Sequence, residues 1–160
     1  MNEQKAVTEF EKGNQLLQEG KLEDAIAAYC CAIELNSANS WFHQQLGEAL
    51  AKQGRLDEAV TAFCSAIELK PDFSWSHHHL GDALAQQQKW KESAEAFGKA
   101  IELNREHDGS YVGLAKSLAK LGQLDEAIGA YRHASELNPD ADWIHQALAS
   151  VLQQQKESNL

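Results

Sequence analysis

Three consecutive histidines, His77, His78 and His79, are the residues of this chain whose type best suits metal chemistry. Successive residues of an α-helix point about 100° apart, so three in a row on a regular helix do not converge on one ion. His78 and Asp82 make a better pair, because residues four apart share a helix face. Two ligands fall short of the four that a structural zinc site takes. We therefore predict no bound metal and no cofactor.

Nucleophilic catalysis is not indicated by the residue pattern either. The three cysteines, Cys30, Cys31 and Cys64, are few and odd in number, which favours reduced thiols over disulfides. No Cys–His–Asn or Ser–His–Asp grouping suggests an activated nucleophile. We predict that the chain is not an enzyme.

Charge and hydropathy exclude two classes of partner. The 160 residues carry a net charge of −10, whereas binding to nucleic acid or to an anionic membrane needs clustered lysine and arginine. No apolar run approaches the roughly 20 residues of a membrane span, and the first ten residues lack the apolar region of a signal peptide. We expect a soluble, cytoplasmic protein with no nucleic-acid or membrane partner.

One pattern of small and apolar residues recurs through almost the whole chain, with a period of about 34 residues. Its fullest copy contains Leu46, Gly47, Leu50, Ala59, Phe63, Ala66 and Pro71. Equivalent residue types return upstream and downstream, at Gly13, Leu16, Ala25, Tyr29 and Ala32, at Leu80, Gly81, Leu84, Phe97 and Ala100, and at Leu114, Ala115, Leu118, Ala127, Tyr131, Ala134 and Pro139. In this spacing the chain resembles the tetratricopeptide repeat (TPR) family, in its bacterial-type tandem form.

The resemblance implies an all-α fold, a right-handed superhelical solenoid of four TPR helix hairpins plus a C-terminal capping helix. We expect a single domain over residues 1–156, with repeats at about 6–39, 40–73, 74–107 and 108–141, a capping helix at 142–156 and a tail at 157–160. The expected hairpin helices are residues 3–19, 22–36, 40–53, 56–70, 74–87, 90–104, 108–121 and 124–138.

Glycines at fixed places in the repeat predict where its backbone is most constrained. Gly20, Gly54 and Gly122 each follow a first helix, where a left-handed cap needs a residue without Cβ. Gln88 stands at that place in the third repeat. We therefore predict that the third repeat, or a chain end, is the first part to unfold.

In TPR proteins the first helix of each hairpin lines a concave face that binds peptides or partner domains. By this resemblance the predicted groove residues of the chain are Phe10, Asn14, Trp41, Gln44, Glu48, Trp75, His78, Asp82, Lys116, Lys120 and Trp143. The acidic residues among them fall in the middle of the groove and the lysines toward one end. Such a charge pattern would orient a bound peptide.

Tryptophan recurs with the repeat period on these first helices. Trp41 and Trp75 are one period apart and Trp143 lies two periods further, with Gly109 at the intervening place. Regularly spaced indoles suit an extended ligand. The alternative is that they pack between repeats and expose only an edge. Two further sets are expected to pack: the periodic histidines His43, His77 and His145, and Trp90, which replaces a leucine.

One TPR subclass clamps the C-terminal carboxylate of chaperone tails with lysine, asparagine and arginine. Asn14 matches one clamp position, but Phe10, Gln45, Trp75 and His79 occupy the others, so we do not predict this ligand. The predicted function is a non-catalytic scaffold that holds a peptide or protein partner in its groove. Two alternatives stay open: the substrate-docking region of a larger glycosyltransferase-like or other modifying enzyme, and a self-associating assembly module. We expect a monomer or weak self-association.

Overall fold

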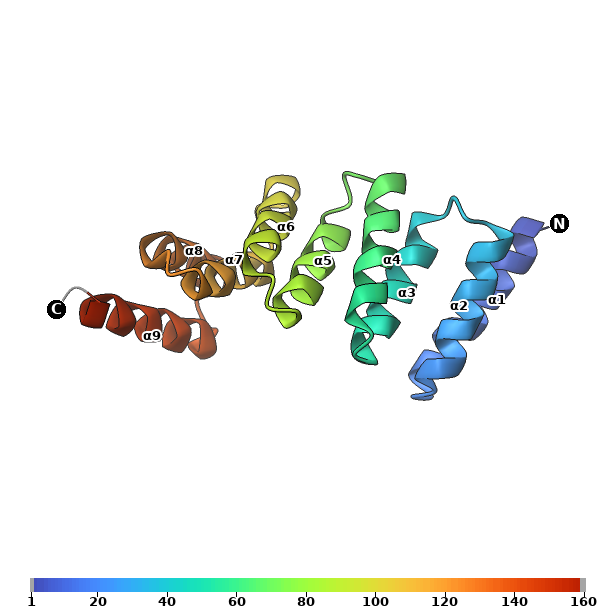
Figure 1. The fold of residues 1–160 in the computed structure, drawn as a ribbon, viewed down its shortest axis with the longest axis horizontal. Helices are drawn as coiled ribbons and strands as arrows, with labels where there is room; N and C mark the ends of the chain where they lie inside the picture. Colours follow the sequence, from blue (N-terminus) through green and yellow to red (C-terminus); the bar gives the residue numbers. More distant parts are fainter. Residues whose placement is uncertain (1, 159–160) are drawn as a thin grey trace.

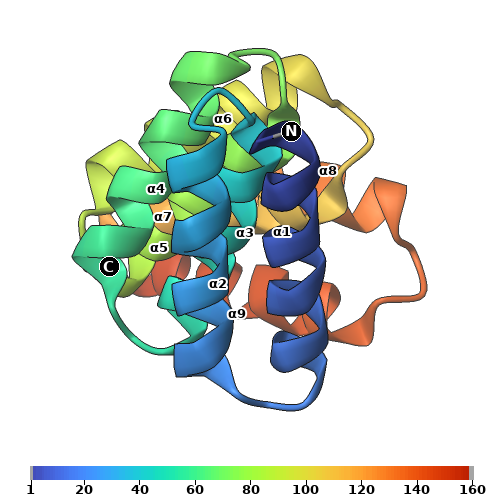
Figure 2. The same cartoon turned by 90° about the vertical axis from the view of Figure 1, so that its right-hand side faces the viewer.

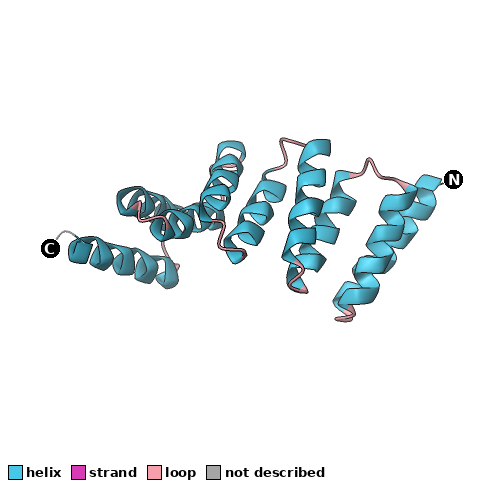
Figure 3. Cartoon of the chain, in the orientation of Figure 1, coloured by secondary structure: helices cyan, strands magenta, loops and turns pink. Residues whose placement is uncertain are grey.

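The chain is all-helical wherever its structure is described. The computed structural model describes residues 2–158, which contain nine α-helices and no β-strand, joined by short loops (Figure 3). The helices are α1 (Asn2–Gln18), α2 (Leu22–Leu35), α3 (Ser40–Lys52), α4 (Leu56–Leu69), α5 (Ser74–Gln86), α6 (Trp90–Leu103), α7 (Asp108–Lys120), α8 (Leu124–Leu137) and α9 (Asp142–Ser158). Each predicted hairpin helix runs one residue past its observed end. Within this part of the chain no helix is long and apolar enough to cross a membrane.

The helices form antiparallel hairpins that stack in a row, with the N-terminus at one end and the C-terminus at the other (Figure 1). Each hairpin packs on the next mainly through its second helix: α2 on α3, α4 on α5, and α6 on α7, while α9 packs on α8. The hairpins turn progressively about the long axis, which is visible along the row in Figure 2. The predicted superhelical solenoid is confirmed.

Close contact between the two helices of a hairpin depends on a glycine and a facing aromatic ring. A Cβ placed on Gly47 would lie 2.6 Å from the ring of Phe63, and one on Gly13 would lie 2.6 Å from the ring of Tyr29. Both rings are buried. In these hairpins a side chain at the glycine position would push the helices apart, whereas the fourth repeat has Ala115 at the equivalent position.

Most of the buried apolar residues form two clusters, and most of the third repeat lies between them. One cluster runs from Ala6 to Ala83 and the other from Val112 to Val151. Near their junction the interior is partly polar, because the buried Ser93 hydroxyl donates to the Gly81 carbonyl at 2.9 Å and lies 2.9 Å from the Ser117 hydroxyl. These hydroxyls are hydrogen-bonded, but they supply less apolar burial than the residues of either cluster.

The turn that ends α5 has the conformation expected of a glycine, although it is built with glutamine. The backbone φ of Gln88 is 60°, while Gly20, Gly54 and Gly122 have φ of 76°, 79° and 77° in the equivalent turns. A left-handed conformation costs an L-residue with a Cβ roughly 1–2 kcal/mol. This strain is a local reason why the third repeat is predicted to open early.

Replacing Gln88 by glycine is expected to stabilise the protein by roughly 0.5–1 kcal/mol, since the released strain exceeds the extra chain entropy that glycine loses on folding. Urea unfolding followed by circular dichroism measures the change. The reverse substitution, Gly54→Gln, serves as the matched control and should destabilise by a similar amount. A Gln88→Gly variant that unfolds at lower urea than the parent protein contradicts this prediction.

The periodic histidines hold loops rather than filling the core, which corrects the packing role predicted for them. The Nε2 atoms of His43, His77 and His145 lie 3.0, 2.8 and 2.9 Å from backbone carbonyl oxygens six residues earlier, on Ser37, Pro71 and Pro139. All three rings keep some exposure to solvent. Each imidazole therefore ties the start of a first helix to the loop that precedes it.

Candidate partner-binding groove

Two hollows lie along the face formed by the first helices. One, of about 310 Å³, is lined by residues that include Glu48, Lys52 and His79. The other, of about 560 Å³, extends over α5, α7 and the start of α9. Asp82 and Gln86 line both, so the two hollows adjoin along the array. Together they are named the groove below. Of the predicted groove residues, Trp41, Trp75 and His78 line neither hollow.

The three periodic tryptophans are about half exposed and also make contacts with neighbouring side chains. Trp41 and Trp75 are 45% and 46% exposed, and Trp143, which lines the larger hollow, is 51% exposed. Trp41 lies edge-on to Phe73, with ring centroids 6.0 Å apart. Ligand contact and packing between repeats, which were predicted as alternatives, therefore do not exclude each other: one indole can pack against a neighbour and still expose about half of its surface.

Trp75 has more aromatic contacts than the other two indoles, because three imidazoles lie around it. It stacks on His79 at 5.5 Å between ring centroids, lies 4.8 Å from His107 and meets His78 edge-on at 5.7 Å. Gly109 occupies the position between Trp75 and Trp143 at which the repeat period would place a tryptophan. A Cβ on Gly109 would lie 3.1 Å from the His107 ring. The missing tryptophan thus leaves room for an imidazole beside Trp75.

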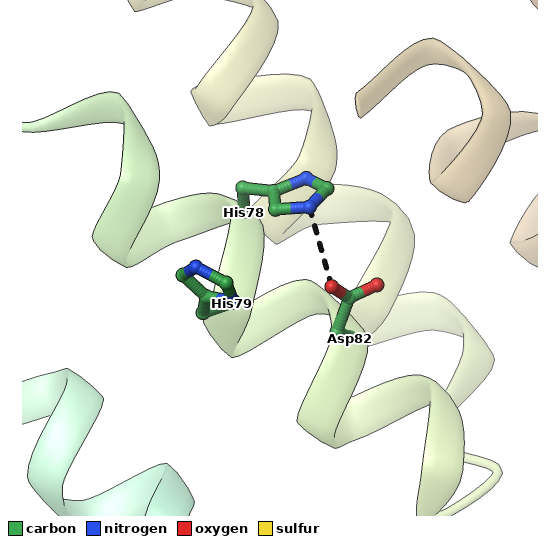
Figure 4. A group of neighbouring side chains, drawn as sticks. All are labelled: His78, His79 and Asp82. Atoms are coloured by element: carbon green, nitrogen blue, oxygen red, sulfur yellow. Dashed lines mark ion pairs between the residues drawn. The ribbon is translucent and has the colours of Figure 1, made fainter. Parts of the chain in front are cut away.

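A chain of polar contacts crosses the groove centre from α7 to α5. His107 Nδ1 lies 2.7 Å from Ser110 Oγ, Ser110 Oγ lies 3.1 Å from His78 Nδ1, and His78 Nε2 lies 3.2 Å from Asp82 Oδ2. The contacts are mutually consistent if each group donates to the next, so that His78 Nε2–H donates to the Asp82 carboxylate. Figure 4 shows His78 and Asp82 turned toward each other.

Burial governs protonation at the groove centre. It lowers the pKa of His78 to about 4, with further lowering by the positive charges of His107 and His79. The pKa of Asp82 is raised, again mainly by burial, against the opposing effect of His79, Lys116 and His107. Near pH 7 the contact between His78 and Asp82 is therefore a hydrogen bond from a neutral imidazole and not an ion pair.

One end of the larger hollow is positively charged. Lys116 and Lys120 line it together with Trp90, and the Lys120 ammonium lies 5.9 Å from the centre of the Trp90 ring. Within residues 2–158 neither lysine has a carboxylate within 4.0 Å. The predicted basic end of the groove is thus available to an anionic group.

Two of the predicted groove residues are in fact buried, and for these the structure corrects the prediction. Phe10 is only 9% exposed and stacks on Phe42 with ring centroids 4.7 Å apart. Gln44 is 1% exposed, accepts a hydrogen bond from Ser76 and donates one to Glu48 at 3.0 Å. Phe10 is therefore part of the core, while Gln44 supports the groove residue Glu48 from beneath.

Asn14 is partly buried and its side-chain oxygen accepts a hydrogen bond from the Tyr29 hydroxyl at 2.8 Å. The remaining predicted groove residues keep exposed or partly exposed side chains: Trp41, Glu48, Trp75, His78, Asp82, Lys116, Lys120 and Trp143.

The chain matches family models along most of its length. A model described as TPR repeat matches residues 13–54, 47–88 and 115–156, and a model described as tetratricopeptide repeat matches residues 74–107. The chain belongs to the tetratricopeptide repeat family. A search among curated protein sequences gave no match.

Solved TPR structures share the fold at low sequence identity. MamA from Desulfovibrio magneticus RS-1 superposes with a TM-score of 0.91 at 22% identity, over 95% of this chain and 86% of that one. YrrB, described as a TPR protein with an unusual peptide-binding site, gives 0.83 at 22% identity, over 94% and 78%. The first TPR domain of Spaghetti (RPAP3), bound to an HSP90 peptide, gives 0.72 at 21% identity, over 73% and 93%. At these identities the likeness concerns the fold.

Some residues of this TPR groove were not predicted from the sequence. Trp90 was expected in the core, but it is partly exposed and forms part of the groove wall. His107 was not singled out, although it contacts both Trp75 and His78. His107 is the N-cap residue of α7, at the end of the loop after α6. Its contact with Trp75 could not be predicted without knowing how α7 is oriented relative to α5.

Proposed function

We propose that the chain is a non-catalytic scaffold that binds an extended peptide segment of a partner protein along the groove. The observation that carries the proposal is that the two hollows adjoin at Asp82 and Gln86, so that hollowed surface extends across several repeats. An extended segment can follow such a surface and contact each repeat in turn. Structural neighbours described with bound or binding peptides support the same proposal.

The side chains of the groove give the proposed segment a direction. Lys116 and Lys120 present ammonium groups that suit acidic side chains or a terminal carboxylate. Glu48 and Asp82, nearer the middle, suit a basic or hydrogen-bond-donating residue. Half-exposed Trp75, which stacks on His79 of the smaller hollow, offers an indole beside the groove for an apolar anchor residue.

Selection of peptides from a random displayed library tests this proposal on the purified chain. Selected sequences are expected to carry an acidic residue and an aromatic or aliphatic anchor, and their affinity can be measured by fluorescence anisotropy. Replacing Lys116 and Lys120 together by glutamate should weaken such peptides about tenfold at low salt, and less at high salt, where charges are screened. Affinity that survives this double charge reversal at every salt concentration contradicts the proposed direction.

A cytoplasmic location and the absence of nucleic-acid or membrane partners belong to the same proposal. The net charge of −10 opposes binding to anionic polymers and surfaces, and Cys30, Cys31 and Cys64 are free and exposed, which suits a reducing compartment. We propose a monomer or a weakly self-associating protein. A light-scattering series over concentration tests this, and a stable oligomer at micromolar concentration contradicts it.

A further inference from the structure

Three potential metal ligands converge on one turn of α5, in the middle of the groove. One ligand atom from each of His78, His79 and Asp82 lies within 4.8 Å of the others, and all three side chains are partly exposed. Figure 4 shows His78 turned toward the Asp82 carboxylate and His79 further from it on the same stretch of helix. The cluster uses two of the three consecutive histidines, while His77 turns away to the Pro71 carbonyl.

Helix geometry explains why these three residues converge when three consecutive histidines do not. Successive residues are rotated by about 100°, so Asp82 lies about 40° around the axis from His78 and about 60° from His79, between the two. Asp82 is also one turn further along, at the i+4 and i+3 spacings that bring side chains together. The i, i+4 spacing alone points to the His78–Asp82 pair and does not single out His79.

We propose that His78, His79 and Asp82 form a binding site for a divalent transition-metal ion such as Zn²⁺, Co²⁺ or Ni²⁺. Two imidazole nitrogens and one carboxylate oxygen make a donor set that suits these borderline ions. Ca²⁺ prefers six to eight oxygen ligands and Mg²⁺ mainly oxygen and water, so both should bind poorly. The remaining coordination positions face the groove and are open to water or to a ligand there.

The distances are close to those of a metal site. In a tetrahedral site with bonds of about 2.0–2.1 Å, two ligand atoms lie about 3.3 Å apart. His78 Nε2 and Asp82 Oδ2 already lie 3.2 Å apart, so these two groups have to turn toward a shared ion while His79 has to approach it. The His79 ring stacks on the rings of both Trp75 and Phe63, at centroid distances of 5.5 and 5.8 Å, and these contacts restrain the plane of the imidazole.

Neighbouring groups hydrogen-bond to the proposed ligands or add charge beside them. When His78 Nε2 binds the ion, its Nδ1–H can donate to Ser110 Oγ, which lies 3.1 Å away and in turn donates to His107 Nδ1 at 2.7 Å. A second partner of this kind is typical of metal-binding histidines. Glu48 Oε1 lies 3.6 Å from His79 Nε2 and adds negative charge beside the ion.

Titration of the purified, tag-free chain with Co²⁺ and Zn²⁺, followed by visible absorption and calorimetry, tests this inference independently of peptide binding. We expect one ion per chain, with Asp82→Asn and His79→Gln each weakening affinity at least tenfold, the effect that even an outer-shell change can reach. His77→Gln is the matched control and should change affinity less than twofold. Circular dichroism verifies that each variant is folded.

Two outcomes overturn the proposal. One is that wild type binds Co²⁺ no more tightly than Asp82→Asn, which would assign any binding to the exposed thiols or to other surface histidines. The other is that His77→Gln weakens binding as much as His79→Gln does. Should His79→Gln be unfolded, Asp82→Asn decides alone, because amide and carboxylate have nearly the same shape and the side chain is about half exposed.

Discussion

Replacing Trp75 by alanine is expected to weaken a groove-bound peptide roughly thirtyfold or more while leaving the helix content near that of wild type. Trp75 is 46% exposed, yet its ring is held by His79 and His107, so it offers a large apolar surface that loses little entropy on binding. Truncating a central aromatic anchor typically costs about 2 kcal/mol or more, and about 1.4 kcal/mol corresponds to a factor of ten. Fluorescence anisotropy with a selected, labelled peptide measures the change.

The control for this prediction lies on the opposite set of helices. Glu102 is exposed and paired with Lys99, one turn earlier on α6, at 2.7 Å. Glu102→Gln should therefore leave peptide affinity within about twofold, as expected of an exposed ion pair. A Trp75→Ala variant with full affinity would show that the partner uses another surface. Loss of helix content in that variant would show instead that the indole is needed for the third repeat to fold.

The helices of this chain could be predicted almost to the residue because the repeat constrains them many times over. Gly54 and Gly122 mark the ends of first helices, and the same turn recurs at Gln88 with φ of 60° even though the glycine is missing. Neighbouring repeats impose one backbone path, so a single unfavourable residue adopts that path at a cost in energy. Periodicity therefore predicted the fold even where the local residue disagreed with it.

The groove was less predictable because it depends on contacts between repeats. Gln44 has a groove-lining position within its own repeat, but Ser76 of the next repeat covers it and hydrogen-bonds to it at 2.7 Å. Trp90 replaces a core leucine, but the larger ring reaches the hollow beside Lys120. The sequence of one repeat does not give the rotation between repeats, and that rotation decides which side chains are covered.

The repeat period also does not show which buried aromatic ring packs against two repeats at once. Phe97 on α6 is 1% exposed and contacts glycines on both sides, since a Cβ on Gly81 of α5 would lie 3.0 Å from its ring and one on Gly113 of α7 would overlap it. Phe97 thus fills the space within the third repeat and the space between the third and fourth. Its position bridges the two apolar clusters of the core.

Replacing Phe97 by alanine is therefore expected to destabilise the protein by about 3–5 kcal/mol, the usual cost of removing a buried phenylalanine from a packed interior. Because hairpins of a repeat array are stabilised by their neighbours, the loss should uncouple the two halves. Urea unfolding is then expected to broaden or to split into two transitions. A single transition shifted by less than 1 kcal/mol would show that the helices close around the cavity.

Gly113→Ala tests the contact between Phe97 and α7 separately from any general loss of stability in the third repeat. In wild type the new methyl group meets the Phe97 ring, and overpacking of about 1–3 kcal/mol should outweigh the roughly 1 kcal/mol that alanine gains over glycine in a helix. In the Phe97→Ala background the ring is gone, so the same substitution should stabilise. Gly98→Ala, where a Cβ meets nothing within 4 Å, should stabilise in both backgrounds. The change of sign at Gly113 is the coupling that a direct contact predicts, and equal effects in both backgrounds would show that Phe97 does not pack against α7 in solution.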